Sequence, residues 1–211
     1  WAERCLAEHR RLTVERAGKP AQALFGVVQG AQHEDLRRQA ARGLVALDLD
    51  GTGFDGFGIG GAIEKERLGQ IVRWVNEELP ADKPRHLLGI GEPDDLFTAV
   101  ENGCDTFDCV NPSRVARSGR VYTTTGHFNV TSAPSRRDFG PVDTACDCYT
   151  CAHYSRAYLH HMFKTREMLG ATLATIHNER FIVSLVDRMR NAIEDGTFAE
   201  MKADFLARFY V

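Results

Sequence analysis

The stretch Ala23-Leu-Phe-Gly-Val-Val-Gln-Gly30 is the first of four short apolar runs. The others are Phe54-Asp-Gly-Phe-Gly-Ile-Gly-Gly61, Arg85-His-Leu-Leu-Gly-Ile-Gly91 and Thr106-Phe-Asp-Cys-Val-Asn111. Amphipathic stretches with helical periodicity separate them, at residues 34–47, 65–79 and 94–101. This alternation is typical of repeated βα units, so the sequence predicts an α/β fold with a parallel sheet.

The flanking regions follow other patterns. Residues 121–130 predict a hairpin that turns at Gly126, and the tail predicts helices over 154–169, 178–193 and 198–210, with breaks at Gly170 and Gly196. Trp1 opens a stretch that has the pattern of a helix interior with no capping residue before it. We therefore expect the chain to begin partway through a longer protein.

The composition is that of a globular protein. The chain has 211 residues, 43% hydrophobic and 26% charged. No run approaches the roughly 18 apolar residues that a membrane span needs, so we expect no membrane partner and a cytoplasmic location. The net charge of −3 argues against nucleic-acid binding by bulk charge, so any such binding would need a local basic patch.

Three of the six cysteines lie within six residues: Cys146, Cys148 and Cys151. Thiols this close cannot cross-link distant parts of the chain, and their spacing favours a structural zinc site with three thiolates and one imidazole. The fourth ligand stays open among the downstream histidines: His153, His160, His161 and His177. The other thiols are expected to be small buried hydrophobic groups: Cys5, Cys104 and Cys109.

Polar residues at the ends of the apolar runs are candidates for chemistry, because sites in parallel α/β folds are built where strands end. Asp108 is either a helix or loop cap or a nucleophile, and carboxylates attack sugar anomeric carbons. Gln29 could read the edge of a planar heterocycle or simply hold a neighbouring loop.

A basic segment, Ser113-Arg114-Val-Ala-Arg117-Ser-Gly-Arg120, follows Asp108 in the sequence. Its arginines could grip phosphates or bases, or form only a solvated loop. Gly89 and Gly91 resemble a phosphate-binding turn, but the acids that follow them fit a helix N-terminus better.

In these segments the sequence resembles the tRNA-guanine transglycosylases, also called queuine tRNA-ribosyltransferases, and most closely the bacterial members. The matching segments run in family order over nearly the whole chain: residues 25–30, 60–61, 82–85, 89–95, 107–110, 112–117, 146–151, 155–161 and 175–178.

The resemblance implies the C-terminal half of a (β/α)8 TIM barrel with a zinc-binding subdomain. Residues 1–130 would supply the last four βα units and a hairpin, and residues 131–211 the zinc-binding subdomain and C-terminal helices. The family's general base and purine-binding acid lie in the other half of the barrel. We therefore expect the isolated chain not to turn over alone.

The resemblance also implies exchange of guanine at the tRNA wobble position for a 7-deazaguanine, with Asp108 as the nucleophile that forms a covalent ribosyl ester. The implied base-binding residues are Gln29, Gly60, Gly61 and Ala62. The implied RNA-contacting residues are Gly89, Ile90, Gly91, Glu92, Pro93, Asp94, Asp95, Ser113, Arg114, Val115, Ala116 and Arg117. The implied ligands of one zinc ion are Cys146, Cys148, Cys151 and His177. The family is largely homodimeric, with the zinc region near the subunit contact.

Two other function classes remain. One is a non-catalytic, zinc-stabilised RNA-binding or partner subunit, against which the retention of Asp108 and Gln29 argues. The other is a small-molecule barrel enzyme that binds phosphate at Gly89 and Gly91, a function that leaves the cysteine cluster and the arginines without a use.

Overall fold

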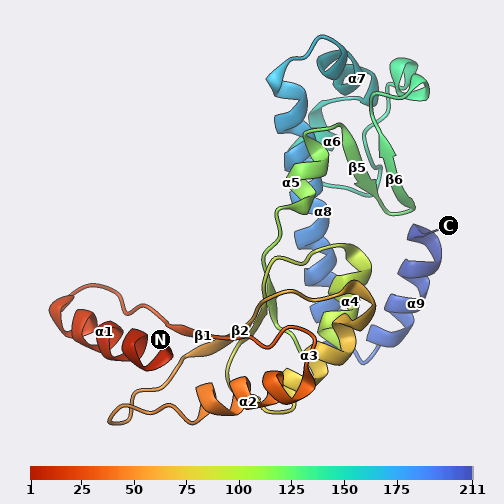
Figure 1. Ribbon diagram of the computed structural model, residues 1–211. Coiled ribbons are helices and arrows are strands. Elements are labelled where there is room, and N and C mark those ends of the chain that lie inside the picture. Colours follow the sequence, from red (N-terminus) through yellow and green to blue (C-terminus); the bar gives the residue numbers. More distant parts are fainter. Residues whose placement is uncertain (211) are drawn as a thin grey trace. The chain divides into compact units, whose positions relative to one another are not determined.

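The structure is a computed structural model that describes residues 1–210, and it divides into two compact units (Figure 1). The first unit comprises Trp1–Ile90 and Thr98–Cys109, and the second comprises Gly91–Phe97 and the chain from Val110 onward. Each unit contains a hydrophobic cluster of its own. The sequence-based boundary at residue 130 stays a prediction; the hairpin before it belongs to the second unit.

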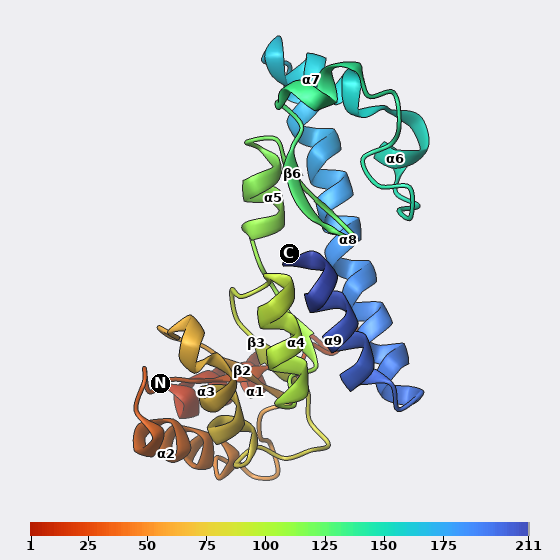
Figure 2. The same cartoon turned by 90° about the vertical axis from the view of Figure 1, so that its right-hand side faces the viewer.

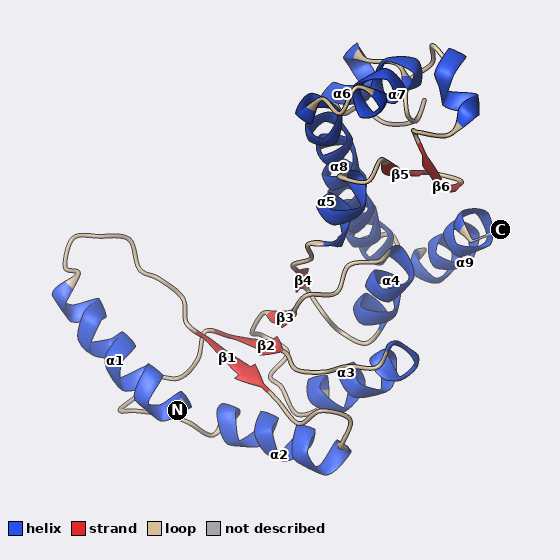
Figure 3. Cartoon of the chain, turned by 45° about the horizontal axis from the view of Figure 1, so that its top comes forward, coloured by secondary structure: helices blue, strands red, loops and turns tan. Residues whose placement is uncertain are grey.

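A parallel four-stranded sheet forms the centre of the first unit (Figure 3). Its strands are β1 (Phe25–Val28), β2 (Gly56–Ile59), β3 (Arg85–Leu87) and β4 (Thr106–Phe107), in that spatial order. All three pairings are parallel, and sequence neighbours are spatial neighbours, as repeated βα units require. The predicted α/β fold with a parallel sheet is confirmed, and closure into a TIM barrel stays a prediction.

One helix precedes β1 in the sequence, and the others lie between the strands, close to the predicted ranges. They are α1 (Ala2–Glu15), α2 (Glu34–Val45), the short 3₁₀ helix η1 (Lys65–Arg67), α3 (Leu68–Asn76) and α4 (Pro93–Glu101), whose residues are shared between the units. Val28 and Ile59 of the sheet belong to one buried cluster with Ala41 of α2. Val27 points the other way and is 46% exposed, because successive strand side chains alternate between faces.

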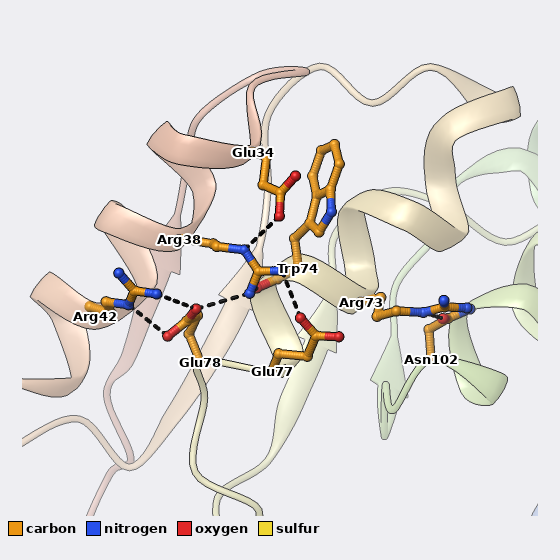
Figure 4. A network of polar contacts seen from close by, with 8 residues as sticks. All are labelled: Glu34, Arg38, Arg42, Arg73, Trp74, Glu77, Glu78 and Asn102. Atoms are coloured by element: carbon orange, nitrogen blue, oxygen red, sulfur yellow. Dashed lines mark hydrogen bonds and ion pairs between the residues drawn. The ribbon is translucent and has the colours of Figure 1, made fainter.

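An ion-pair network joins α2 to the residues that follow α3 (Figure 4). Arg38 bonds to Glu34, Glu77 and Glu78, at 2.8, 2.7 and 2.9 Å. Arg42 donates to both carboxylate oxygens of Glu78, at 2.7 Å each. These two arginines, Arg42 first, lower the pKa of Glu78 to about 2. The network therefore ties α2 to the C-terminal end of α3 through a carboxylate that stays ionised.

The second unit is mainly helical. Its elements are α5 (Asn111–Ala116), β5 (Arg120–Thr123), β6 (Gly126–Asn129), the 3₁₀ helix η2 (Ala133–Arg137), α6 (Tyr149–His153), α7 (Arg156–Lys164), α8 (Met168–Glu194) and α9 (Phe198–Phe209). Figures 1 and 2 show α5 lying alongside α8. The predicted hairpin is confirmed, with one change: the turn consists of Thr124 and Thr125, and Gly126 is already the first residue of β6.

The predicted break at Gly170 is wrong, because α8 runs without interruption from Met168 to Glu194. A Cβ at Gly170 would lie 3.0 Å from the Cβ of Met162 on α7, so this glycine allows two helices to approach closely. The predicted break at Gly196 is confirmed, since its φ of +71° ends the helical path.

The helices offer no candidate for a membrane span within residues 1–210. Even α8, with 27 residues, is not apolar enough along its length to cross a bilayer.

Candidate functional site

The four parallel strands end in register. Val28 pairs with Ile59, Ile59 with Leu87, and Leu87 with Phe107. The next residue of each strand therefore lies at one edge of the sheet, and these residues are Gln29, Gly60, Leu88 and Asp108. Three of the four are residues that the sequence analysis singled out, so the sheet brings the candidates to a common edge.

Asp108 presents its carboxylate to solvent, with a side chain that is 59% exposed. Its Oδ1 accepts hydrogen bonds from His86 Nε2 at 3.0 Å and from the backbone N–H of Gly89 at 3.1 Å. The His86 bond, supported by the Gly89 bond, lowers the pKa of Asp108, although burial acts in the opposite direction. Asp108 is thus an ionised, accessible carboxylate held by two donors.

His86 was missed by the sequence analysis. It pairs in register with Thr106 of the next strand, and its Nδ1 lies 2.8 Å from Thr106 Oγ1. An ionised Asp108 can only accept, so His86 Nε2 carries the proton, and the Nδ1 of a neutral ring accepts from the Thr106 hydroxyl. Strand alternation in the sequence places His86 on one face of β3, but it does not show which residue of the next strand lies opposite. That pairing is known only once the register is known.

Gln29 lies against the two glycines at the end of β2. A Cβ at Gly60 would lie 3.0 Å from Gln29 Nε2, and one at Gly61 would lie 2.6 Å from Gln29 Oε1. Gly61 also has a φ of +89°, which disfavours other residues. Ala62 follows, with its carbonyl accepting from Gln32 Nε2 at 3.0 Å. The candidate base-binding residues are therefore contiguous, and their role stays a prediction.

A buried arginine supports these turns, and the sequence analysis also missed it. Arg37 of α2 is fully buried and donates to the carbonyl oxygens of Gly60 at 2.6 Å and Ala31 at 2.8 Å. Burial lowers its pKa, and its Nη2 has no hydrogen-bond partner within residues 1–210. In the sequence Arg37 looks like any polar residue of an amphipathic helix, because the carbonyls that it holds lie on other segments.

The segment 89–95 has partners that explain several of its residues. Gly89 has a φ of +74°, which directs its N–H to Asp108. In the second unit, Glu92 accepts from the side-chain amide of Asn111, and Asp94 accepts from the Tyr210 hydroxyl at 2.8 Å. Burial is the main cause that raises the pKa of the Tyr210 hydroxyl, and the hydrogen bond to Asp94 is the second. The acids thus have structural partners, and the implied RNA contacts of Gly89–Asp95 stay predictions.

The basic segment is not the loop that the sequence suggested. Ser113 to Ala116 lie within the short helix α5, Arg117 caps it, and Arg114 and Arg117 are exposed. The helix forms because Pro112 occupies its first turn, where a missing N–H costs nothing. Buried Asn178 of α8 anchors it, donating to the carbonyl oxygens of Pro112 and Arg120 at 3.0 Å each.

The cysteine cluster closes on one histidine. The ligand atoms of Cys146, Cys148, Cys151 and His177 all lie within 4.8 Å of one another. His177 Nδ1 is 3.5 Å from Cys148 Sγ and 3.3 Å from Cys151 Sγ. Its Nε2–H donates to the Tyr122 carbonyl at 2.7 Å, which leaves Nδ1 as a free lone pair toward the thiols. These four residues could hold a metal ion.

His177 lies in the middle of α8 and not at the start of a helix, as the sequence suggested. Of the other histidines, His160 is turned to the Val130 carbonyl, with its Nδ1 at 2.9 Å. A hydrogen bond with the Cys151 thiol, supported by His177, lowers the pKa of the Cys148 thiol and favours the thiolate that a metal needs.

The remaining cysteines have mixed outcomes. Cys104 is buried as expected, and burial raises the pKa of its thiol to about 12, so it behaves as an inert hydrophobic group. Cys109 is half-buried. The expectation for Cys5 is wrong, because this residue lies on the exposed face of α1, where Leu6 is the buried residue.

Comparisons with known proteins identify the family of the chain. The family model described as "Queuine tRNA-ribosyltransferase" matches residues 1–211. Among curated relatives with that name, the protein of Moorella thermoacetica is 46% identical over 99% of this chain and 53% of its own length. The protein of Caldanaerobacter subterraneus subsp. tengcongensis is 44% identical over 100% of this chain and 54% of its own length. The protein of Bacillus pumilus is 42% identical over 99% of this chain and 52% of its own length. The chain thus spans about half the length of the curated relatives it matches.

Proposed function

The chain belongs to the queuine tRNA-ribosyltransferase family, and from that premise we propose that it works in exchanging guanine for a 7-deazaguanine at the tRNA wobble position. Such an enzyme is a glycosyltransferase that transfers a pentosyl group and acts in the cytoplasm, where tRNA is modified. The observation that carries the proposal is the carboxylate of Asp108, which is held ionised and open to solvent at the end of β4.

Asp108 acts as the nucleophile in two displacements. In the first, a carboxylate oxygen bonds to the ribose C1′, and the bond from C1′ to guanine N9 breaks with its electron pair going to the base, which takes up a proton from water. In the second, N9 of the incoming base loses its proton to water and bonds to C1′, and the carboxylate departs. Two inversions retain the configuration of the sugar.

The base is read at the ends of β1 and β2. The amide of Gln29 offers two donors and one acceptor, and its position over Gly60 and Gly61 leaves no room there for a larger residue. The two glycines let the Gln29 amide pack against the backbone, where it can read the edge of a planar base, with Ala62 following in the chain. Arg37 fixes this surface by donating a hydrogen bond to the Gly60 carbonyl.

The RNA is gripped by exposed arginines on α5 and by the turn at 89–95. Arg114 and Arg117 are exposed and can bind phosphates bidentately or stack on unpaired bases. Ser113, Val115 and Ala116 would contribute through the helix that presents these arginines.

The metal is zinc, in a structural role. Three thiolates and one imidazole fill a tetrahedral zinc site and leave no open position for water. The four donors fit that requirement here, because they converge within 4.8 Å and Tyr122 fixes the His177 tautomer. Zinc would cross-link α6 to α8. It would take no part in the reaction of the substrate.

We also propose a homodimer with a contact near the zinc region. The supporting observation is exposed aromatic surface there: Phe139 is 82% exposed and Tyr149 is 54% exposed. Tyr154 and Tyr158 stack beside Tyr149, with ring centroids 5.0 Å apart. Aromatic side chains grouped at a surface are enriched in protein interfaces.

The test is covalent trapping with tRNA. We expect the full-length protein, which contains this chain, to form a denaturant-resistant adduct with tRNA. Asp108→Asn in that protein should lose the adduct and exchange guanine about 10³-fold more slowly or worse. Asp82→Asn, which changes an exposed acid elsewhere in the first unit, should behave as the unsubstituted protein. An adduct that persists in Asp108→Asn rules out the nucleophile. Tight tRNA binding with no exchange by the unsubstituted protein would favour the second candidate, a non-catalytic RNA-binding subunit.

A further inference from the structure

We propose that His86 is a positioning residue that, together with the Gly89 N–H, occupies Oδ1 of Asp108 and so reserves Oδ2 for the attack on ribose. The inference rests on the proposed function and goes beyond it, because it assigns separate roles to the two oxygens and a role to a histidine outside the cysteine cluster.

The geometry carries this assignment. The His86 bond at 3.0 Å and the Gly89 bond at 3.1 Å both end on Oδ1. Two donors on one oxygen fix the carboxylate plane and draw charge toward that oxygen. Because the Asp108 side chain is 59% exposed, its other oxygen is open to a substrate.

Thr106 fixes the histidine in turn. Its hydroxyl is 2.8 Å from His86 Nδ1, and the parallel register pairs the two residues directly. In the neutral ring, donation from Thr106 to Nδ1 leaves the proton on Nε2, where Asp108 needs a donor. Thr106, His86 and Asp108 thus form a chain of hydrogen bonds that runs across β3 and β4.

The chain of hydrogen bonds has different consequences for the two displacements. When Oδ2 bonds to C1′, Oδ1 becomes the carbonyl oxygen of an ester and loses negative charge, so the donors help this step little. When the C1′–Oδ2 bond breaks, its electron pair returns to the carboxylate, and the donors on Oδ1 stabilise the returning charge. His86 therefore assists departure of the carboxylate more than its attack.

The experiment compares His86→Leu, which removes the donor, with His86→Gln, which keeps an amide donor. We expect kcat for guanine exchange to fall about 10- to 100-fold in His86→Leu and less in His86→Gln, with KM for tRNA within about twofold. The trapped adduct should accumulate to a larger steady-state fraction in His86→Leu, since its breakdown is the step that slows. His9→Leu, a substitution on α1, is the matched control and should change neither quantity.

Two further measurements separate positioning from structural support. His86 lowers the pKa of Asp108, so the acidic limb of the kcat/KM profile should move to higher pH in His86→Leu. Thr106→Val keeps the side-chain shape and removes only the hydroxyl, so it should show the same changes at smaller size.

The outcomes are distinguishable. If the unsubstituted full-length protein forms no adduct and exchanges no guanine, the proposed function fails. If it does both, and His86→Leu has the same kcat, adduct fraction and pH profile, the role of His86 is overturned while the function stands. Equal losses in His86→Leu and His86→Gln that track a lower Tm would also overturn it, because they would indicate a structural role.

Discussion

The site around Asp108 in the first unit and the cysteine cluster in the second differ in solvent exposure: the key polar side chain is exposed in the first and buried in the second. Asp108 is 59% exposed and accepts hydrogen bonds from His86 and Gly89 on Oδ1. His177 is fully buried, with one ring nitrogen on the Tyr122 carbonyl and the other facing the thiols. The carboxylate is open to solvent, whereas the imidazole is buried with a partner at each ring nitrogen.

The supporting residues differ in the same way. Around Asp108 they come from neighbouring strands and act through single hydrogen bonds to side-chain atoms. Around the cluster, His177 and the adjacent Asn178 tie one long helix to β5 and α5 through backbone carbonyls. Changes at the first site should therefore affect chemistry, and changes at the second should affect folding.

The largest effect should come from removing the metal ligands. Cys151→Ala, or a strong chelator, should release the zinc and lower Tm on the order of 10 °C, because metal binding is linked to folding. Metal analysis and thermal unfolding measure both changes. The exposed thiol of Cys5 supplies the control, since Cys5→Ala should keep the zinc and the Tm. A Cys151→Ala protein that retains stoichiometric zinc would contradict the ligand set.

A smaller effect should follow Asn178→Ala. The substitution leaves two backbone carbonyls and the Tyr122 N–H without their partner, so we expect a loss of about 2–3 kcal/mol in unfolding free energy. Because α5 carries Arg114 and Arg117, tRNA affinity should fall about tenfold as well. Denaturant unfolding and filter binding check the two parts. Asn191→Ala, at an exposed position of α8, should leave both unchanged; equal effects of the two substitutions would refute the anchoring role.

The smallest effect should come from the ion-pair network of the first unit. Arg42 and Arg38 hold the folded-state pKa of Glu78 at about 2, below its ordinary value of 4.5. The carboxylate thus stabilises the fold above pH 4.5, and this contribution declines as the pH falls toward 2. Unfolding free energy measured across this range should have a shallower slope in Glu78→Gln than in the unsubstituted protein. Glu3→Gln on α1 should keep the original slope, and an unchanged slope in both would count against the network.

The sequence predicted the features that depend on near neighbours in the chain. The βα units were visible because strand and helix periodicities differ, and the cysteines because a metal needs them at short spacing. The break at Gly170 failed for the opposite reason: packing against Met162 of α7, a contact between helices, allows the glycine inside α8.

The sequence by itself determined the parallel α/β pattern, the three clustered cysteines and the family resemblance, which implied Asp108 as nucleophile and His177 as the fourth metal ligand. Only the tertiary structure showed that Arg37 is buried and holds the Gly60 carbonyl, and that His86 and Gly89 meet on one oxygen of Asp108. The physical reason is register. Hydrogen bonds between segments about 20 or more residues apart exist only once strands and helices are aligned, and no local pattern records that alignment.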